Sequence, residues 1–249
     1  MNVGQKVVVT GAAGGIGKAL VHAFMGKGFQ VIGLDHVVKP EGLVCWKYLE
    51  LDLVKLVYSE SSGNEILSEL KALIGEEGLY ALINNAAVQV LGGVESLTIQ
   101  GWRQTLDVNL LAPFKLVQGL LSELEHGDGC VVNISSIHAR LTKADFVAYA
   151  TSKAALSGMT RAMAIDLGGR VRVNAIEPAA IATDMLKAGF AGQSEQFTKL
   201  EACHPQGRIG SPEEVAALAL SIASGDLRFL HGACVGLDGG ISGRLYDPA

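Results

Sequence analysis

The sequence predicts an α/β fold in which a doubly wound parallel sheet of about seven strands carries helices on both faces. Short, almost wholly apolar segments alternate with segments of helical periodicity along the chain. Apolar strands indicate burial on both faces, and alternating strands and helices generate parallel βαβ units. The 249 residues contain no Pro/Ser-rich linker, composition break or internal repeat. We therefore expect one domain that spans residues 1–249.

The first half of the chain is expected to form four strands. A β-branched run at Lys6–Thr10 leads into a glycine-rich loop, and Ile16, Leu20 and Phe24 then recur at helical spacing. Further strands are predicted at Gln30–Leu34, Trp46–Leu51 and Tyr80–Ile83, with a helix at Asn64–Ile74 before the last of them.

The second half is expected to continue the alternation. The predicted helices cover Trp102–Leu124 and Val147–Leu167, and the predicted strands cover Cys130–Ile134, Val171–Ile176 and Ala233–Leu237. Ser211 and Pro212 have the residue types that favour the N-cap and the first position of another helix. The least regular segment, Ala179–Gly210, is the natural candidate for a mobile substrate lid.

The composition excludes several classes of partner. Apolar residues make up 49% and charged residues 18% of the chain, which suits a large buried core. The net charge of −5 and the lack of a basic cluster predict no nucleic-acid partner and no binding to an anionic membrane. No apolar stretch approaches about 20 residues and no leader pattern is present, so no membrane span is expected.

The four cysteines, Cys45, Cys130, Cys203 and Cys234, are scattered and include no C-x-x-C pair. Three of them lie in apolar or strand-like contexts, which predicts buried free thiols. We expect no metal site. A soluble protein of the reducing cytoplasm is the expected result.

The loop Thr10–Gly17 lies between a predicted strand and a predicted helix, the context that gives such a glycine pattern meaning. Gly11 permits a tight turn, Gly15 lets the backbone approach a phosphate, and Gly17 lets the helix pack closely on the strand. The N–H groups and dipole at the start of the helix favour a pyrophosphate. The alternative is a glycine turn that serves packing alone.

Asp35 closes the second strand, eighteen residues beyond Gly17. A carboxylate there accepts hydrogen bonds from the adenosine ribose hydroxyls of a dinucleotide and repels a 2′-phosphate. No arginine lies beside it, and His36 and Lys39 are weak substitutes. The sequence therefore predicts NAD rather than NADP, with a purely structural acid at a strand end as the alternative.

Tyr149 and Lys153 are four residues apart on a predicted helix, so their side chains project from one face. Free tyrosine has a pKa of about 10, and a nearby ammonium lowers that pKa by stabilising the phenolate. We expect a strongly lowered pKa that makes Tyr149 an effective general acid or base. Ser136, just after a predicted strand, can donate a hydrogen bond to the reacting oxygen. The preceding strand and serine distinguish this Y-x-x-x-K pattern from the many that are only solvated helix pairs.

Together these elements resemble the short-chain dehydrogenase/reductase family over essentially the whole chain. The matching positions are Thr10–Gly17, Asp52, Leu53, Asn84–Ala87, Asn109, Ile134–Ser136, Tyr149, Lys153, Arg172–Asn174, Glu177–Ala179, Thr183 and Leu237–Gly240. The resemblance implies a Rossmann fold and hydride exchange with a nicotinamide cofactor. It also implies Ser136 as the catalytic serine, because the family spacing to the tyrosine is thirteen residues.

The resemblance assigns roles to single residues. Implied cofactor contacts are Gly11, Gly14, Gly15, Ile16, Gly17, Asp35, Asp52, Leu53, Asn85, Ala86, Ala87, Tyr149, Lys153, Pro178, Ile181 and Thr183. Of these, Asp52 and Leu53 are expected to contact adenine. Asn109 is expected to hold a water in a proton relay behind Lys153.

Two positions depart from the family pattern, which has glycine where this chain has Ala87 and Ala179. An alanine at positive φ costs about 1 kcal/mol or more. We expect negative φ at both positions and hence a mild effect, because every charged or nucleophilic role remains filled.

Substrate residues are predicted around the same pocket. Gln89 and His138, with Ser136 and Tyr149, form a set similar to that of short-chain 3-hydroxybutyrate dehydrogenases, in which such groups help to hold a carboxylate. Arg140, Lys143, His204 and Arg208 are candidates for additional positive charge, or are surface charges. The expected substrate is a polar secondary alcohol or its ketone, with a hydroxy acid among the candidates. Sugars, 3-oxoacyl thioesters and steroids remain open.

Two other functions share these motifs. A non-catalytic NAD-sensing protein could keep the fold without the reaction, although it would not need a tuned phenol. Sugar-nucleotide epimerases and dehydratases usually have a T-G-x-x-G-x-x-G loop and a longer C-terminal region, which this chain lacks. The family resemblance further implies a homo-oligomer, a dimer or a tetramer, paired through the two long helices.

Overall fold

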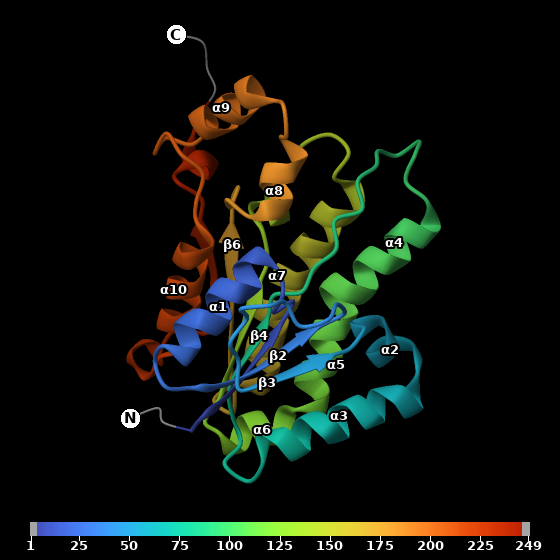
Figure 1. The fold of residues 1–249 in the computed structure, drawn as a ribbon, viewed down its shortest axis with the longest axis vertical. Coiled ribbons are helices and arrows are strands. Elements are labelled where there is room, and N and C mark those ends of the chain that lie inside the picture. Colours follow the sequence, from blue (N-terminus) through green and yellow to red (C-terminus); the bar gives the residue numbers. More distant parts are fainter. Residues whose placement is uncertain (1–3, 246–249) are drawn as a thin grey trace.

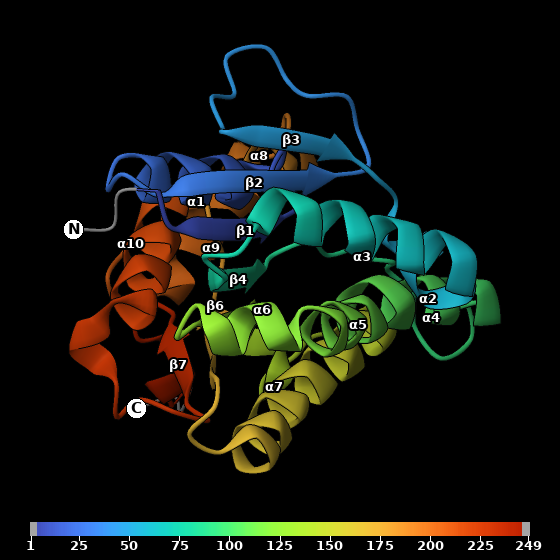
Figure 2. The same cartoon turned by 90° about the horizontal axis from the view of Figure 1, so that it is seen from below.

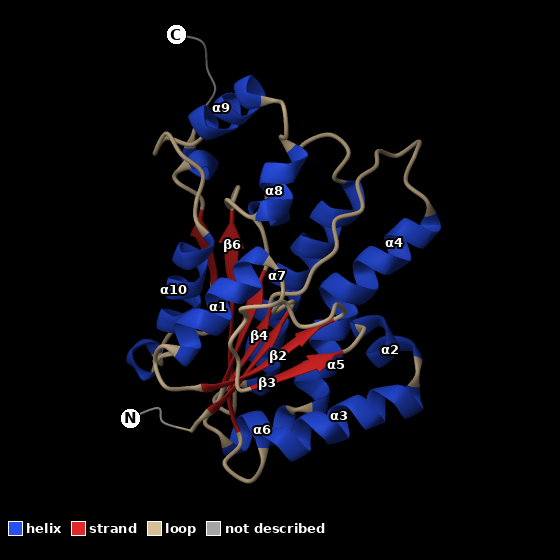
Figure 3. Ribbon diagram, in the orientation of Figure 1, coloured by secondary structure: helices blue, strands red, loops and turns tan. Residues whose placement is uncertain are grey.

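The structure, a computed structural model, describes residues 4–245. The strands are β1 Lys6–Thr10, β2 Gln30–Asp35, β3 Lys47–Glu50, β4 Leu79–Asn84, β5 Cys130–Ile134, β6 Arg172–Pro178 and β7 Cys234–Leu237. They form one parallel sheet in the order β3-β2-β1-β4-β5-β6-β7 (Figure 3). The order reverses between β1 and β4, and such a reversal opens a ligand crevice at the carboxyl ends of the strands.

Helices cover both faces of the sheet (Figure 1 and Figure 2). One layer consists of α1 (Gly15–Met25) and α10 (Pro212–Ala223), and the other of α2 (Leu53–Tyr58), α3 (Glu60–Ile74), α5 (Ala112–Gly119), α6 (Leu121–His126) and α7 (Val147–Leu167). Side chains alternate between the two cores along each strand. In β1, Val7 and Val9 pack in the layer of α1, while Val8 packs in the opposite layer. The predicted doubly wound sheet is therefore confirmed.

The single long helix predicted over Trp102–Leu124 is wrong. The chain instead forms α4 (Ile99–Leu106), a π-helical segment (Asp107–Leu111), α5 and α6. Pro113 gives a physical reason, because it has no N–H to bond the carbonyl four residues earlier. The N–H of Ala112 bonds the carbonyl of Asp107, five residues back, which is the π-helical pattern.

Two further regions contain helices that the sequence pattern did not predict. Asp52 caps the short helix α2, and Ser59 caps α3, which begins four residues before its predicted start. The segment Ala179–Gly210, expected to be the least regular, contains α8 (Asp184–Gly189) and α9 (Ser194–Cys203). Both helices lie beyond the carboxyl end of β6 (Figure 1).

The cysteines differ from expectation in their burial. All four are free thiols, but Cys130 alone is buried and the other three are partly exposed. Within residues 4–245, no group of three or more His, Cys, Asp or Glu side chains is arranged to hold a metal ion. No helix in the described part of the chain is both long and apolar enough to cross a membrane.

Glycines allow β1, α1 and β4 to approach one another closely at the crossing point. Gly11 has a φ of +65°, and a Cβ there would lie 2.8 Å from the Cα of Ala86. A Cβ on Gly17 would lie 1.9 Å from the carbonyl oxygen of Gly11. Since that oxygen belongs to the backbone, α1 would have to move away from the sheet.

We predict that Gly17→Ala destabilises the protein by about 3 kcal/mol or more, because the added methyl overlaps backbone that cannot relax. Gly169→Ala is the control, since a Cβ at that turn position meets nothing within 4 Å, and it should change stability by no more than about 0.5 kcal/mol. Urea unfolding of both variants makes the measurement. Equal stability of Gly17→Ala and the native protein would contradict the packing argument.

Candidate active site

The start of α1 faces the crossing point between β1 and β4 and fits a pyrophosphate. Gly14 is the N-cap in an extended conformation, and no described side chain caps this end of the helix. The first N–H groups of α1 are therefore available to an anion. A Cβ on Gly15 would lie 3.0 Å from Cγ2 of Thr183. Glycine at this position therefore lets the start of α1 lie close to Thr183. The residues present thus fit a dinucleotide.

Hydrogen bonds from the residues that follow β4 hold the glycine loop in place. The Asn85 side-chain amide donates to the carbonyl oxygens of Thr10 (2.9 Å) and Gly11 (3.1 Å). The Thr10 hydroxyl accepts from the N–H groups of Asn85 and Ala86, both at 3.0 Å. The amide of Asn85 thus holds the loop in shape, a role that the family resemblance did not assign to it.

Asp35 is held at the end of β2 by three donors. One carboxylate oxygen accepts from the Ala13 N–H at 2.9 Å. The other accepts from the His36 N–H at 2.8 Å and lies 3.0 Å from Nδ1 of the same histidine. These contacts fix a carboxylate beside the glycine loop, where the sequence predicts the adenosine ribose.

The other predicted cofactor residues lie on elements around the same edge of the sheet. Asp52 is exposed and caps α2, while Leu53 is buried in the core. Pro178 ends β6, Ile181 is bridged to Gly210, and Thr183 caps α8. Their contacts with adenine and nicotinamide stay predictions.

The two alanines that replace family glycines are unstrained. Among the described residues other than glycine, only Asp128 and Asp145 have positive φ. Ala87 and Ala179 therefore have the negative φ that we expected, and the backbone is not strained at either position. A mild effect on the cofactor stays a prediction.

The catalytic residues predicted from the sequence converge at the end of β5. Ser136 is buried, and its oxygen accepts from the His138 N–H at 3.2 Å, so its hydroxyl proton can be directed toward Tyr149 and a reacting oxygen beside it. Lys153 is only 2% exposed, and its ammonium donates to the Ile134 carbonyl oxygen at 2.8 Å. The same ammonium lies 5.7 Å from the centre of the Tyr149 ring.

The expected lowering of the Tyr149 pKa is wrong for the protein alone. Burial raises the pKa of the Tyr149 phenol, and its hydrogen bond with Ser136 offsets part of that increase. Burial also lowers the pKa of Lys153 to about 8. The cost of burying both groups outweighs the attraction between ammonium and phenolate on which the expectation rested.

Asn109 lies in the π-helical segment and is almost fully buried. Its side chain accepts from the Val88 N–H at 2.8 Å and donates to the Val88 carbonyl at 2.9 Å. It also donates to Ser152 at 3.0 Å, and the Ser152 hydroxyl donates to the Tyr149 carbonyl at 2.7 Å. Asn109 therefore connects the β4 loop to α7, and its relay water stays a prediction.

An aromatic wall borders Tyr149 on the substrate side. The His138 ring stacks on Phe146 with centroids 4.5 Å apart, and both rings meet Tyr149 edge-on. The ammonium of Lys143 lies over the Phe146 ring, 4.7 Å from its centre. Burial, with a smaller effect of Lys143, lowers the pKa of His138 to about 4, so the imidazole is neutral at pH 7. Gln89 is exposed, and its part in substrate binding stays a prediction.

The remaining candidate cations are engaged by the protein. Arg140 pairs with Glu177 at 2.8 Å, and Arg208 pairs with Glu214 at 2.7 Å. His204 is buried, and its Nδ1 is hydrogen-bonded to the Leu200 carbonyl at 2.9 Å. None of these groups points an unsatisfied positive charge at Tyr149.

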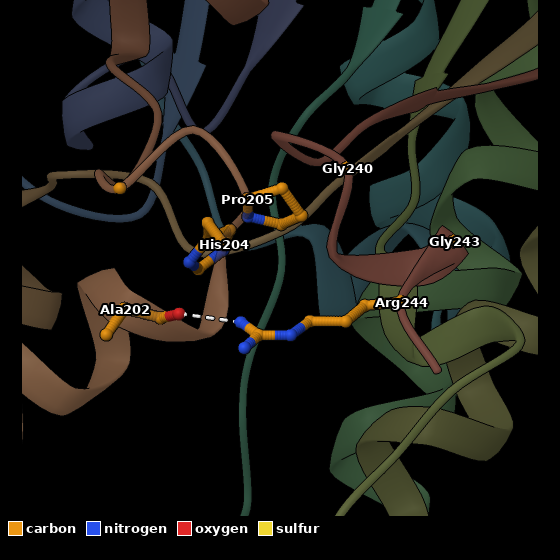
Figure 4. A pocket seen from close by; sticks show the side chains of 7 residues that line it. Ala202, His204, Pro205, Gly240, Gly243 and Arg244 are labelled. Carbon is orange, nitrogen blue, oxygen red and sulfur yellow. Dashed lines mark hydrogen bonds between the residues drawn. The ribbon is translucent and has the colours of Figure 1, made fainter. Parts of the chain in front are cut away.

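A pocket near the C-terminal turn lies apart from this chemistry (Figure 4). Its lining includes His204, Pro205, Gly240 and Arg244, and none of the predicted catalytic residues. Arg244 donates to the carbonyl of Ala202 at 2.8 Å, at the end of α9. The pocket thus lies between the end of α9 with the residues that follow it and the C-terminal 3-10 turn Ile241–Gly243.

Sequence reasoning missed two residues at the site. Phe146 is three residues before Tyr149, so helical spacing could have placed both rings together. Glu177 is an acidic residue in an otherwise apolar strand, and a charge in such a position needs a buried partner.

The sheet order, the glycine loop and the serine–tyrosine–lysine site define a nucleotide-dependent oxidoreductase of the Rossmann type. The family model described as enoyl-(acyl carrier protein) reductase matches residues 11–242. The chain belongs to the short-chain dehydrogenase/reductase family. It is an oxidoreductase that acts on CH–OH groups.

Individual relatives agree over nearly the full length. The NAD-dependent glycerol dehydrogenase of Listeria innocua is 34% identical, over 96% of this chain and 94% of its own. L-fucose dehydrogenase of Mus musculus is 35% identical, over 89% of this chain and 82% of its own. The ligand-free aldohexose dehydrogenase of Thermoplasma acidophilum superposes with a TM-score of 0.88 at 30% identity, over 99% of this chain and 97% of its own.

We predict that Lys153→Met abolishes turnover yet raises the free energy of unfolding near pH 7 by about 3 kcal/mol, which is the cost implied by moving a lysine pKa from 10.5 to about 8. Between these two values the unfolded chain binds a proton that the folded chain lacks. The native protein therefore gains stability as pH rises through this range, and the advantage of methionine should vanish near pH 10.5.

Urea unfolding at pH 7 and pH 10 makes the measurement. Lys27→Met is the matched control, since Lys27 is exposed, and it should leave stability within about 0.5 kcal/mol at both values. The quantity to compare is the unfolding free energy of Lys153→Met minus that of the native protein. If this difference is smaller at pH 7 than at pH 10, the argument is refuted.

Proposed function

We propose that the protein is an NAD-dependent oxidoreductase that interconverts a neutral, polyhydroxylated secondary alcohol and its ketone. The observation that carries this proposal is the state of the charges around Tyr149. Arg140 and Arg208 are paired with carboxylates and His138 is neutral, so among the described residues Lys143, stacked on Phe146, is the one predicted cation there that keeps its charge without a carboxylate partner. The pocket otherwise offers hydrogen-bonding groups and aromatic surface.

The residues take the following parts in the reaction. The Tyr149 phenolate accepts the proton of the alcohol oxygen during oxidation, and the phenol returns it during reduction. Ser136 donates its hydroxyl proton to the same oxygen and so polarises the carbonyl. Lys153, fixed by the Ile134 carbonyl, supplies a positive charge behind the phenol. NAD, when bound, supplies the hydride acceptor.

The preference for NAD over NADP rests on Asp35. Its carboxylate is fixed by Ala13 and His36 beside the glycine loop, so it cannot easily turn away from a 2′-phosphate. The buried charge would repel that phosphate and accept hydrogen bonds from ribose hydroxyls. The Listeria relative is named as NAD-dependent, whereas other solved relatives are described with NADP.

Several of the relatives' names support a neutral substrate. They include dehydrogenases of glycerol, D-threitol, L-fucose and an aldohexose, all of them polyols or sugars. A hydroxy acid, which the sequence suggested, would place its carboxylate beside a neutral imidazole and arginines that already have partners, and this is costly in a partly buried site. A 3β-hydroxysteroid dehydrogenase is also similar, at 30% identity, so a steroid belongs among the test substrates.

The assembly and location follow as further parts of the proposal. Exposed apolar side chains on neighbouring helical segments, Ile99, Leu111 and Phe114, support a homo-oligomer, and we expect a dimer or tetramer. The four free thiols favour a reducing compartment, the cytoplasm.

We expect turnover of neutral polyols with NAD at a kcat/KM at least about tenfold above that for 3-hydroxybutyrate or a steroid, and at least about tenfold above that with NADP, each factor corresponding to about 1.4 kcal/mol. Nicotinamide absorbance across glycerol, threitol, fucose, 3-hydroxybutyrate and a hydroxysteroid makes the test. NADH binding without turnover of any substrate would indicate a sensor, and a preference for the hydroxy acid would contradict the charge argument.

A further inference from the structure

Glu177 is a buried acid that the proposed reaction does not use. It is 1% exposed on β6, directly before Pro178. One carboxylate oxygen accepts from the Ser157 hydroxyl at 2.8 Å, and the other lies 2.8 Å from Nε of Arg140. That second oxygen has no hydrogen-bond partner among the described residues, so its contact with Arg140 is an ion pair without hydrogen-bond geometry. A buried carboxylate is costly unless paired, so Glu177 strongly restrains both partners.

Both partners belong to the elements that carry the catalytic groups. Ser157 lies on α7 one helical turn after Lys153. Arg140 follows the short 3-10 turn Ile137–Ala139, whose N-cap is Ser136. Glu177 therefore connects the turn that presents the serine to the helix that presents the tyrosine and the lysine.

A second branch of the network leads to the residue beside the catalytic serine. The hydroxyls of Ser157 and Ser135 are 2.8 Å apart, and Ser135 also donates to the Lys153 carbonyl at 3.0 Å. An ionised carboxylate only accepts hydrogen bonds, so Ser157 donates its proton to Glu177. The single proton of Ser135 then serves the Lys153 carbonyl or the Ser157 oxygen, both of which lie within hydrogen-bond distance.

We propose that Glu177 is a positioning residue that sets the distance between Ser136 and Tyr149 through Ser157 and Arg140. This role rests on the proposed oxidoreductase function, because it concerns the alignment of that reaction. Misplacement of a reacting group by about 1 Å can cost 10²-fold in rate. Loss of Glu177 should therefore lower kcat. The groups that bind the cofactor and the alcohol should keep their contacts.

The test compares kcat, KM and NADH affinity in variants of the network. Glu177→Gln removes the negative charge that faces Arg140, and an amide N–H directed at Ser157 would turn that hydroxyl from a donor into an acceptor. We expect kcat to fall at least about tenfold while KM and the NADH dissociation constant stay within about twofold. Ser157→Ala and Arg140→Met should each lower kcat at least about threefold, and Arg140→Lys should recover part of the loss, because it restores a donor.

Glu125→Gln is the matched control, because its pair with Arg170 has the same 2.8 Å separation but lies on the surface, away from the site. It should leave kcat within about twofold. Unchanged kcat in folded Glu177→Gln overturns the proposal. If that variant does not fold, unchanged kcat in Ser157→Ala and Arg140→Met overturns it equally. Absence of turnover in the native protein would instead refute the proposed function, so the two failures are distinguishable.

Discussion

The hydrogen bond from the buried ammonium of Lys153 to the carbonyl of Ile134 is the constraint on which the site depends. It joins α7 to the end of β5, and the two residues that flank the reacting oxygen, Ser136 and Tyr149, are placed by these same elements. Burial makes the ammonium costly, as its lowered pKa shows. In the proposed reaction this charge lies behind the phenol, which would account for a buried lysine that lowers stability.

The sheet topology brings this constraint to the cofactor. The order of the strands reverses between β1 and β4, and the start of α1 faces the opening that results. Thr10, Asn85 and Asn109 connect the glycine loop, the β4 loop and α7 by hydrogen bonds, so the two halves of the site share one rigid frame. The aromatic wall of His138 and Phe146 and the arginines that already have partners are the groups to which we assign specificity in the proposed function.

Local sequence signals predicted most of this arrangement. The glycine loop, Asp35, Ser136 and the Tyr149–Lys153 pair were found because each has a fixed spacing from a strand or helix. The π-helical break at Asp107–Leu111 was missed because hydrophobic spacing reports which face is buried and not the hydrogen-bond pattern. The raised pKa of Tyr149 and the pairs of Arg140 and Arg208 were missed for a different reason. Both depend on contacts between segments distant in sequence and on how deeply the groups are buried.

Proton transfer by Tyr149 is the central claim, and Tyr149→Phe tests it most directly, because the substitution removes one oxygen and keeps the ring against His138 and Phe146. Steady-state kinetics with the best neutral alcohol and NAD should show kcat/KM reduced at least about 10²-fold. NADH should still bind with nearly native affinity. Undiminished turnover in a folded Tyr149→Phe protein would contradict the account.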